Sequence, residues 1–381
     1  MFSLRAANMQ GIVSRCKSVL FSSSTQAYKG LHFKPNVGAV YHSRYQFLRQ
    51  LGSGQHSTVW LVKDVTKSGN LLAIKVLTDE VTSYQGKHAF ELDILKNIQA
   101  HAKSSTHAGI HHLLTLQDYF YERGDEGEHL FLVTDVLDRT LLQVQQSANS
   151  RKLPMPLVKS ITRQLLLALD FLHDVCQVVH TDIKQDNVQF VPVDVTSLEL
   201  ETNENENTAE IPDATRRVKL TDYGTAMPSY TKRERLIQPE ALRAPEVLLG
   251  CTWGPSADIW NLGCLIFELL TGGCLFRPSD GPNYTASQQH LASIFAIVGL
   301  GQDVTRQRFL PFAKKGSHYR TYFNEADGIR LAFEAPEPLQ RVLEVYHIKD
   351  DMLHDLLSSM LRIIPDDRKS AKELLSHPWL L

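Results

Sequence analysis

Cysteine is scarce in this sequence of 381 residues. The five cysteines are odd in number, widely scattered and without a Cys-x-x-Cys pair. This pattern favours neither a disulfide framework nor a zinc site with thiolate ligands. We therefore expect reduced thiols that are mostly packed inside the protein, at Cys16, Cys176, Cys251, Cys264 and Cys274.

Long apolar runs and an excess of charge of one sign are also missing. The apolar segment 262–270 is broken by Gly263 and Glu268, so we expect no membrane span. A net charge of −2 argues against a general binder of nucleic acids or membrane surfaces, and no direct nucleic-acid binding is expected. The hydrophobic content of 43% is ordinary for a globular protein, and the length allows a large two-lobed domain.

Acidic residues are absent before Asp64, although basic residues occur at Arg5, Arg15, Lys17, Lys29 and Lys34. Ser-rich, acid-poor segments of this kind are typical of mitochondrial targeting, because a cationic amphipathic helix is attracted to a negative membrane potential. A disordered basic tail without an address is an equal alternative. Under both interpretations residues 1–44 form a leader, with a turn at 35–38, before a folded domain that begins near Tyr45.

Histidine is concentrated in residues 101–112, at positions 101, 107, 111 and 112. The surrounding segment is rich in Ser, Thr, Ala and Gly and has no acidic or thiol partner. A solvated loop is therefore favoured over a metal site.

Residues 178–190 are the stretch around which the remaining motifs are arranged. Asp182, Lys184 and Asn187 lie between two short apolar segments, 178–179 and 188–190, that we interpret as buried strands. Polar side chains on a loop held from both sides are expected to form a functional site.

The amino-terminal part contains a second set of signals. Residues 45–51 alternate like a strand and run into Gly52-Ser53-Gly54, where two glycines let the backbone approach a phosphate closely. The apolar strand predicted at 71–76 carries one lysine, Lys75, which would be costly to bury without a partner. The helix predicted at 89–98 places Glu91 beside its apolar face, whereas Asp93 projects away from it.

The order His-Thr-Asp-Ile-Lys-Gln-Asp-Asn at 180–187 resembles the catalytic loop of protein kinases. Further motifs follow in the order found in that family: Asp222-Tyr-Gly224, Ala244-Pro-Glu246 and Asp258-Ile-Trp-Asn-Leu-Gly263. The resemblance covers residues 45–381. It implies a bilobal α+β fold, with a small lobe (45–137) of antiparallel sheet plus a helix and a larger, mainly helical lobe (138–381).

The resemblance also implies the residues of the site. Asp182 would be the catalytic base, Lys184 would neutralise charge on the transferred phosphoryl group, and Lys75 would pair with Glu91 and the nucleotide phosphates. Asn187 and Asp222 would hold Mg²⁺. Thr134 would be the gatekeeper beside the adenine. The ATP-binding residues would be Leu51, Gly52, Ser53, Gly54, Gln55, His56, Ser57, Thr58, Val59, Ala73, Lys75, Asp135 and Leu137.

Long-range contacts are implied in the same way. Glu246 is expected to pair with Arg368, and Asp258 is expected to brace the backbone near His180. Tyr223 stands where the family usually has phenylalanine. Its ring can pack on Leu95 and His180, but its hydroxyl must then find a partner or water.

Narrower signals concern the acceptor and the branch. Lys184, two positions after the base, indicates serine or threonine as the acceptor. Thr181 replaces an arginine that would receive a phosphate on the activation segment, so we expect activity that does not depend on that phosphorylation. Residues 180–184, 254–272 and 289–292 resemble the SR-protein kinase branch of the CMGC group, particularly its fungal members.

Substrates of that branch are Arg/Ser-rich, splicing-type proteins, which implies a cytoplasmic or nuclear location and leaves a mitochondrial one open. The acidic insertion at 192–217 is either a solvated loop or an electrostatic attraction for such basic substrates. Lys232, Arg233 and Arg235 in the activation segment complicate simple attraction.

Four departures from the family pattern, at Ser53, Gln189, Tyr223 and Pro239, keep open the alternative of a kinase-fold scaffold with weak or no turnover. In the family the position of Gln189 is usually apolar and lies beneath the adenine. The intact base and both metal ligands weigh against that alternative. Small-molecule phosphotransfer is disfavoured by the complete Ala-Pro-Glu segment. The sequence therefore predicts a serine/threonine protein kinase that requires ATP and Mg²⁺.

Overall fold

The computed structural model describes residues 30–67, 69–124, 127–196, 210–231, 235–299, 303–331 and 338–381. Most of the predicted leader lies outside the described residues. The central part of the acidic insertion and two of the activation-segment cations, Lys232 and Arg233, lie outside them as well.

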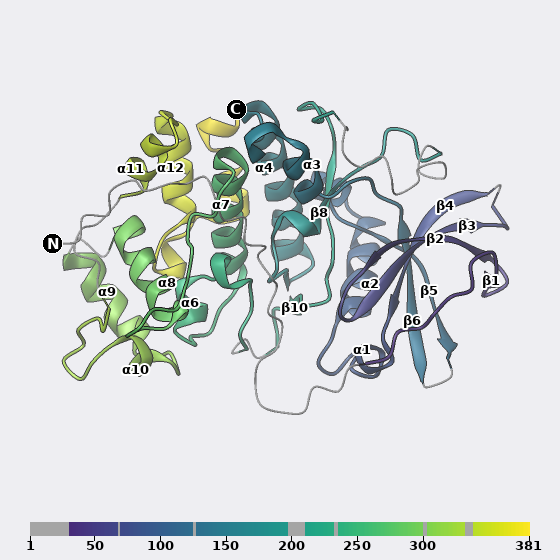
Figure 1. The fold of residues 1–381 in the computed structure, drawn as a ribbon, viewed down its shortest axis with the longest axis horizontal. Helices are drawn as coiled ribbons and strands as arrows, with labels where there is room; N and C mark the ends of the chain where they lie inside the picture. The colour runs from purple at the N-terminus through teal and green to yellow at the C-terminus, as the bar shows by residue number, and fades with distance from the viewer. Residues whose placement is uncertain are drawn as a thin grey trace.

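One antiparallel sheet forms the core of the amino-terminal lobe, at the right of Figure 1. The strand order is β1-β2-β3-β4-β6-β5, so the strand that follows α2 in the chain lies at the edge of the sheet. The large side chains on one face pack into a cluster that includes Tyr45, Phe47 and Phe131. The strands are β1 (Val40–Tyr41), β2 (Tyr45–Ser53), β3 (Ser57–Asp64), β4 (Asn70–Leu77), β5 (Leu116–Arg123) and β6 (Glu128–Asp135).

The folded structure begins before the predicted boundary at Tyr45. Strand β1 pairs with β2, and the ring of Phe33 packs edge-on against Tyr41 and Phe131 at centroid distances of 5.8 and 5.1 Å. The predicted turn is present, since the amide of Ala39 donates to the carbonyl of Asn36. The amino-terminal lobe therefore includes residues that the sequence assigned to the leader.

Two helices and a 3₁₀ turn accompany the sheet: α1 (Asp79–Ser83), α2 (Glu91–Ala102) and η1 (Ala108–His112). Helix α2 buries Glu91, Leu95 and Ile98, whereas Asp93 is exposed as predicted. The apolar face of α2 thus carries the predicted glutamate toward the interior.

The histidine-rich segment is not the solvated loop that the sequence predicted. His107 caps η1 and contacts Asp170 across 3.0 Å, and His112 is buried against the carbonyl of Val218. The prediction was wrong because these partners come from distant parts of the chain. Within the described ranges, no group of three His, Cys, Asp or Glu side chains could hold a metal ion.

Helices dominate the carboxy-terminal lobe, at the left of Figure 1. They are α3 (Leu141–Ser147), α4 (Met155–Asp170), α6 (Pro245–Leu248), α7 (Pro255–Thr271), α8 (Ala286–Ile294), α9 (Asp303–Ala313), α10 (Tyr319–Tyr322), α11 (Leu339–Val345), α12 (Asp351–Met360) and α13 (Ala371–Leu374). Short helical turns connect them: η2 (Asn149–Arg151), η3 (Phe171–Val175), η4 (Gln185–Asn187), η5 (Glu240–Leu242), η6 (Phe295–Gly299), η7 (Pro365–Asp367) and η8 (Pro378–Leu380).

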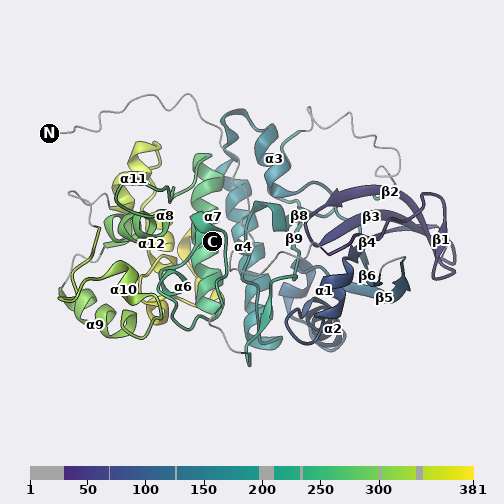
Figure 2. The same ribbon diagram turned by 60° about the horizontal axis from the view of Figure 1, so that its bottom comes forward.

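Helices α4 and α7 lie side by side at the centre of the molecule in Figures 1 and 2. Helix α7 begins with Pro255 in its first turn, where a missing amide costs nothing. It ends at Gly272, whose φ is +76° and where a Cβ would lie 2.7 Å from the Ser150 carbonyl oxygen. Nearly all of its side chains are buried, so α7 is a rigid support for whatever contacts it.

Two short antiparallel strand pairs belong to the carboxy-terminal lobe. Strand β7 (Val178–Val179) pairs with β10 (Met227–Pro228), and β8 (Val188–Phe190) pairs with β9 (Val218–Leu220). The predicted bilobal α+β fold is confirmed. In the described part of the chain, no helix is long and apolar enough to cross a membrane.

Candidate active site

Lys75, Glu91 and Asp222 form the first part of the candidate site. Lys75 Nζ lies 2.6 Å from Glu91 Oε1 and 2.8 Å from Asp222 Oδ1. The lysine and glutamate side chains are largely buried, whereas that of Asp222 is 48% exposed. The ion pair predicted between strand β4 and helix α2 is therefore present, and it extends to the segment after β9.

The charges of this triad stabilise one another. Burial alone would lower the pKa of Lys75, but the carboxylates of Asp222 and Glu91 outweigh it and raise that pKa. The ammonium of Lys75 in turn lowers the pKa of Asp222. Burial raises the pKa of Glu91 against the opposing effect of the lysine. At neutral pH the lysine is charged and Asp222 is ionised, which suits a site for anionic phosphates and a cation.

Asp182, Lys184 and Asn187 form the second part, on the loop between β7 and β8. Asp182 Oδ2 accepts hydrogen bonds from Lys184 Nζ at 2.7 Å and from Asn187 Nδ2 at 2.9 Å. Asn187 Nδ2 also donates to the Asp182 carbonyl at 2.8 Å. Burial would lower the pKa of Lys184, but Asp182 raises it. The ammonium of Lys184, the carboxylate of Asp182 and the amide of Asn187 thus form one hydrogen-bonded cluster.

Asp258 of helix α7 holds the backbone of this loop. Its carboxylate accepts from the amides of His180 at 2.7 Å and Thr181 at 2.8 Å, and it contacts His173 Nε2 at 2.9 Å. Thr181 has a φ of +71°, which is unfavourable for a β-branched residue. The hydrogen bonds from these two backbone amides to Asp258 hold that conformation. The contact predicted between Asp258 and the loop near His180 is confirmed.

Thr225 is a residue that the sequence analysis did not single out. Thr181 Oγ1 lies 3.0 Å from both the carbonyl and the hydroxyl oxygen of Thr225. This contact joins the loop between β7 and β8 to the segment after Asp222. The sequence offered one signal for this contact, the threonine directly after Gly224, and that signal is weak on its own.

Strands β8 and β9 bring the two predicted metal ligands together. The amide of Thr221 donates to the Asn187 carbonyl at 2.8 Å, and His180 Nε2 contacts the Thr221 carbonyl at 3.0 Å. Asp222 follows with a φ of +62°, and the amide of Gly224 donates to its Oδ1. Asn187 and Asp222 are therefore held at adjacent strand ends.

The residues fit a magnesium ion in their donor chemistry. Mg²⁺ prefers oxygen ligands and is commonly bound by one or two carboxylates together with substrate phosphates. Asp222 supplies a carboxylate, and the amide nitrogen of Asn187 points to Asp182, which leaves its amide oxygen as an acceptor. Both candidate ligands are thus hard oxygen donors beside a cationic lysine.

The turn between β2 and β3 carries the predicted phosphate-binding residues. Ser53 pairs with Thr58, and the amide of Gly54 donates to the Ser57 carbonyl at 2.9 Å. Residues 51–55 are exposed, whereas Thr58 is buried and accepts from Trp60 Nε1. Val59 lies opposite Lys75 in the β3–β4 pair, so this turn ends close in the chain to the position that faces the lysine.

The predicted adenine-contacting residues come from β4, β6 and the connection after β6. Ala73 lies opposite Thr134 in the sheet, and both are buried. The Asp135 side chain bonds Gln117 and Lys219, which leaves its backbone groups as the ones to consider for adenine. Asp135 and Leu137 also line a cavity of about 410 Å³, but neither Ala73 nor Thr134 lines it.

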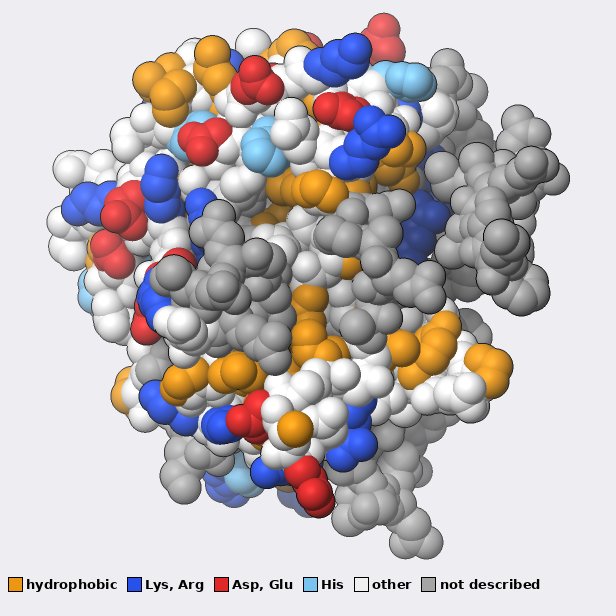
Figure 3. All heavy atoms as spheres, turned by 90° about the vertical axis from the view of Figure 1, so that its left-hand side faces the viewer, with side chains coloured by type: hydrophobic (Ala, Val, Ile, Leu, Met, Phe, Trp, Pro, Cys, Tyr) orange, Lys and Arg blue, Asp and Glu red, His pale blue; other side chains and the backbone are white. Residues whose placement is uncertain are grey.

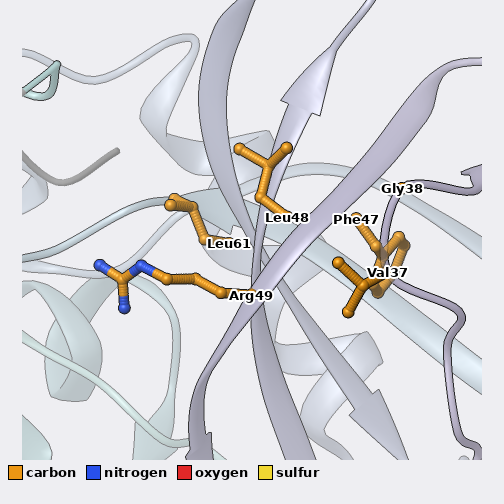
Figure 4. A pocket seen from close by; sticks show the side chains of 6 residues that line it. All are labelled: Val37, Gly38, Phe47, Leu48, Arg49 and Leu61. Atoms are coloured by element: carbon orange, nitrogen blue, oxygen red, sulfur yellow. The ribbon is translucent and has the colours of Figure 1, made fainter. Parts of the chain in front are cut away.

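A second cavity, of about 250 Å³, lies elsewhere in the amino-terminal lobe. Figure 4 shows its lining residues, Val37, Gly38, Phe47, Leu48, Arg49 and Leu61. None of them is a predicted site residue. This cavity is therefore separate from the cluster around Lys75 and Asp182.

Comparison with known proteins agrees with this geometry. The family model for the protein kinase domain matches residues 45–380. A serine/threonine-protein kinase SRPK of Physarum polycephalum is 30% identical, over 93% of this chain and 90% of its own length. A serine/threonine protein kinase of Aspergillus fumigatus is 33% identical, over 93% and 88% of the two chains. SRSF protein kinase 3 of Sus scrofa is 24% identical, over 92% and 89%.

Proposed function

This chain belongs to the protein kinase family, as a serine/threonine kinase similar to SR-protein kinases, and from that premise we propose that it phosphorylates arginine- and serine-rich proteins with ATP. The enzyme class rests on the domain match over most of the chain. The acceptor class is supported by the printed names of its relatives, one of which is a kinase of SRSF proteins.

The hydrogen-bonded cluster of Asp182, Lys184 and Asn187 is the observation that carries the proposal. In it Asp182 accepts the proton of the attacking serine or threonine hydroxyl. Lys184 holds the Asp182 carboxylate in place by a hydrogen bond, which keeps its positive charge beside that carboxylate. Positioning and charge stabilisation of this kind supply most of the catalysis in phosphoryl transfer.

We assign nucleotide binding to the residues around Lys75 and Asp222. Lys75, fixed by Glu91, would bind the phosphates together with the turn at 52–57. Asn187 and Asp222 would hold Mg²⁺, which would neutralise charge on the phosphates. Residues on β4, β6 and the following connection orient the adenine, with Ala73 and Thr134 forming the wall.

Figure 3 shows the outer end of the helical lobe, where basic and acidic side chains are interspersed among apolar ones. Arg235 of the activation segment is half-buried and directs its guanidinium at the His88 carbonyl and the Met227 sulfur. Both partners are neutral, so these contacts hold the guanidinium of Arg235 in place without cancelling its positive charge.

The test is magnesium-ATP turnover by the full chain on an Arg/Ser repeat peptide. A Lys/Ser repeat peptide of equal charge controls for simple electrostatic attraction, and a basic Ser/Thr protein controls for general kinase activity. Asp182→Asn should lower turnover by about 10²- to 10⁴-fold while nucleotide binding persists. Chelation of Mg²⁺ should abolish turnover.

Each outcome is decisive. Faster turnover on the Arg/Ser peptide than on both control substrates, together with loss of turnover in the Asp182→Asn variant, supports the whole proposal. Equal turnover on all three substrates supports the kinase but contradicts the substrate class. Nucleotide binding with no transfer to any substrate contradicts catalysis.

A further inference from the structure

Tyr223, the residue after Asp222, carries a buried hydroxyl. Its side chain is fully buried, and its ring packs against His180 at a centroid distance of 5.6 Å. The hydroxyl oxygen lies 3.1 Å from the Leu220 carbonyl and 3.4 Å from the Leu114 carbonyl. A phenylalanine could make the ring contacts but neither polar contact.

The two carbonyls belong to different parts of the molecule. Leu220 ends strand β9 in the carboxy-terminal lobe, and Leu114 lies between η1 and the sheet strand β5. The Leu114 amide also donates to the Leu220 carbonyl at 3.0 Å. The Tyr223 hydroxyl therefore joins an existing junction between the lobes.

Movement of this ring would also move Asp222. The two residues are adjacent, and Asp222 is held at a φ of +62° with its carboxylate on Lys75. If the ring left its pocket, the hydroxyl would lose both carbonyl contacts and the motif would turn. A buried phenol that loses its acceptor is disfavoured, so the hydroxyl adds to the free energy that holds the ring in place.

We propose that the Tyr223 hydroxyl is a positioning group that keeps Asp222 directed at Lys75. Without the hydroxyl, the ring would keep its contact with His180 but lose both carbonyl contacts, and Asp222 would be held less firmly at Lys75. This inference rests on the proposed function for the meaning of Asp222 as a metal ligand. The contacts themselves can be tested without measuring catalysis.

The first test is amide hydrogen exchange on Tyr223→Phe, which removes only the hydroxyl. Exchange at residues 113–115 and 220–224 should become about three- to tenfold faster, the factor expected from one net hydrogen bond. Tyr319→Phe is the matched control, because it removes from helix α10 a tyrosine hydroxyl that donates a hydrogen bond to Asp327 Oδ1 at 2.9 Å. It should leave exchange in both segments unchanged. Unchanged exchange in Tyr223→Phe would overturn the proposal.

The second test compares two ligand classes. The Kd of ATP without metal should change less than twofold in Tyr223→Phe. The apparent Kd of Mg²⁺ in the presence of ATP should rise three- to tenfold, because a less firmly held Asp222 carboxylate is a poorer ligand for the ion. An equal change for both ligands, or none, would show a purely structural hydroxyl. Neither experiment requires turnover, so failure here is distinct from failure of the kinase assay.

Discussion

Glu246 and Arg368, 122 positions apart in the chain, form a two-pronged ion pair with both side chains fully buried. The Nη1–Oε1 and Nη2–Oε2 distances are 2.6 and 2.7 Å. The guanidinium also lies over the Trp260 ring at 4.9 Å. This pair ties the end of the activation segment to the last helices of the chain.

Arg368→Met is expected to destabilise the protein by about 3–5 kcal/mol. The substitution keeps much of the side-chain volume but leaves the carboxylate of Glu246 buried without a partner, which is the costly way to break a buried pair. Urea unfolding at neutral pH measures the loss.

Asp367→Asn is the matched control for that experiment. Asp367 pairs with Arg308, a side chain that is 56% exposed, so its loss should leave stability essentially unchanged. Equal effects of the two substitutions would contradict the importance assigned to the buried pair.

Arg44→Met should give a pH-dependent loss of stability. Hydrogen bonds from Arg44 lower the pKa of Asp64 from 3.8 to about 2. A depressed carboxyl pKa stabilises the fold above pH 3.8, and this contribution disappears as the pH falls toward 2. Because Arg44 is partly exposed, we expect a difference on the order of 1–2 kcal/mol at pH 7.

Urea unfolding of the wild type and Arg44→Met from pH 7 to pH 3 checks this. The difference between them should be constant above about pH 5 and shrink below pH 4. Arg341→Met, which breaks an exposed pair with Glu344, should show no difference at any pH. A pH-independent loss in Arg44→Met would instead assign it to packing of the guanidinium on the Tyr45 ring.

Phosphatase treatment should leave turnover within about twofold of the untreated level. Thr181 carries no charge to bind a phosphate, and its hydroxyl already bonds Thr225. Thr181→Val should lower turnover without making it depend on phosphorylation. Turnover that falls after phosphatase treatment of the wild type would contradict this prediction.

Gln189→Leu should tighten ATP binding by about fivefold. Gln189 lies half-buried in β8, opposite Lys219, and the family resemblance places it beneath the adenine. A leucine there covers the ring without the desolvation cost of an amide. Calorimetry with ATP measures the change, and inorganic triphosphate, which has no base, should bind with unchanged affinity.

Local patterns in the sequence predicted much of this protein. The single lysine in an apolar strand indicated Lys75, and helical periodicity placed Glu91 inward and Asp93 outward. The ordered motifs indicated the family and, through it, the contact between Glu246 and Arg368. The roles of Asp182, Lys184, Asn187 and Asp222 in catalysis and metal binding stay predictions.

Only the tertiary structure decided which partners the polar groups meet. His107 and His112 are held by Asp170 and Val218, and residues before Tyr45 join the sheet. The Tyr223 hydroxyl has its acceptors on Leu220 and Leu114, the latter 109 positions away. Periodicity tells which side of an element faces inward, because burial follows from the residue's own polarity. It cannot tell what lies opposite, because a hydrogen-bond partner is set by the packing of distant segments.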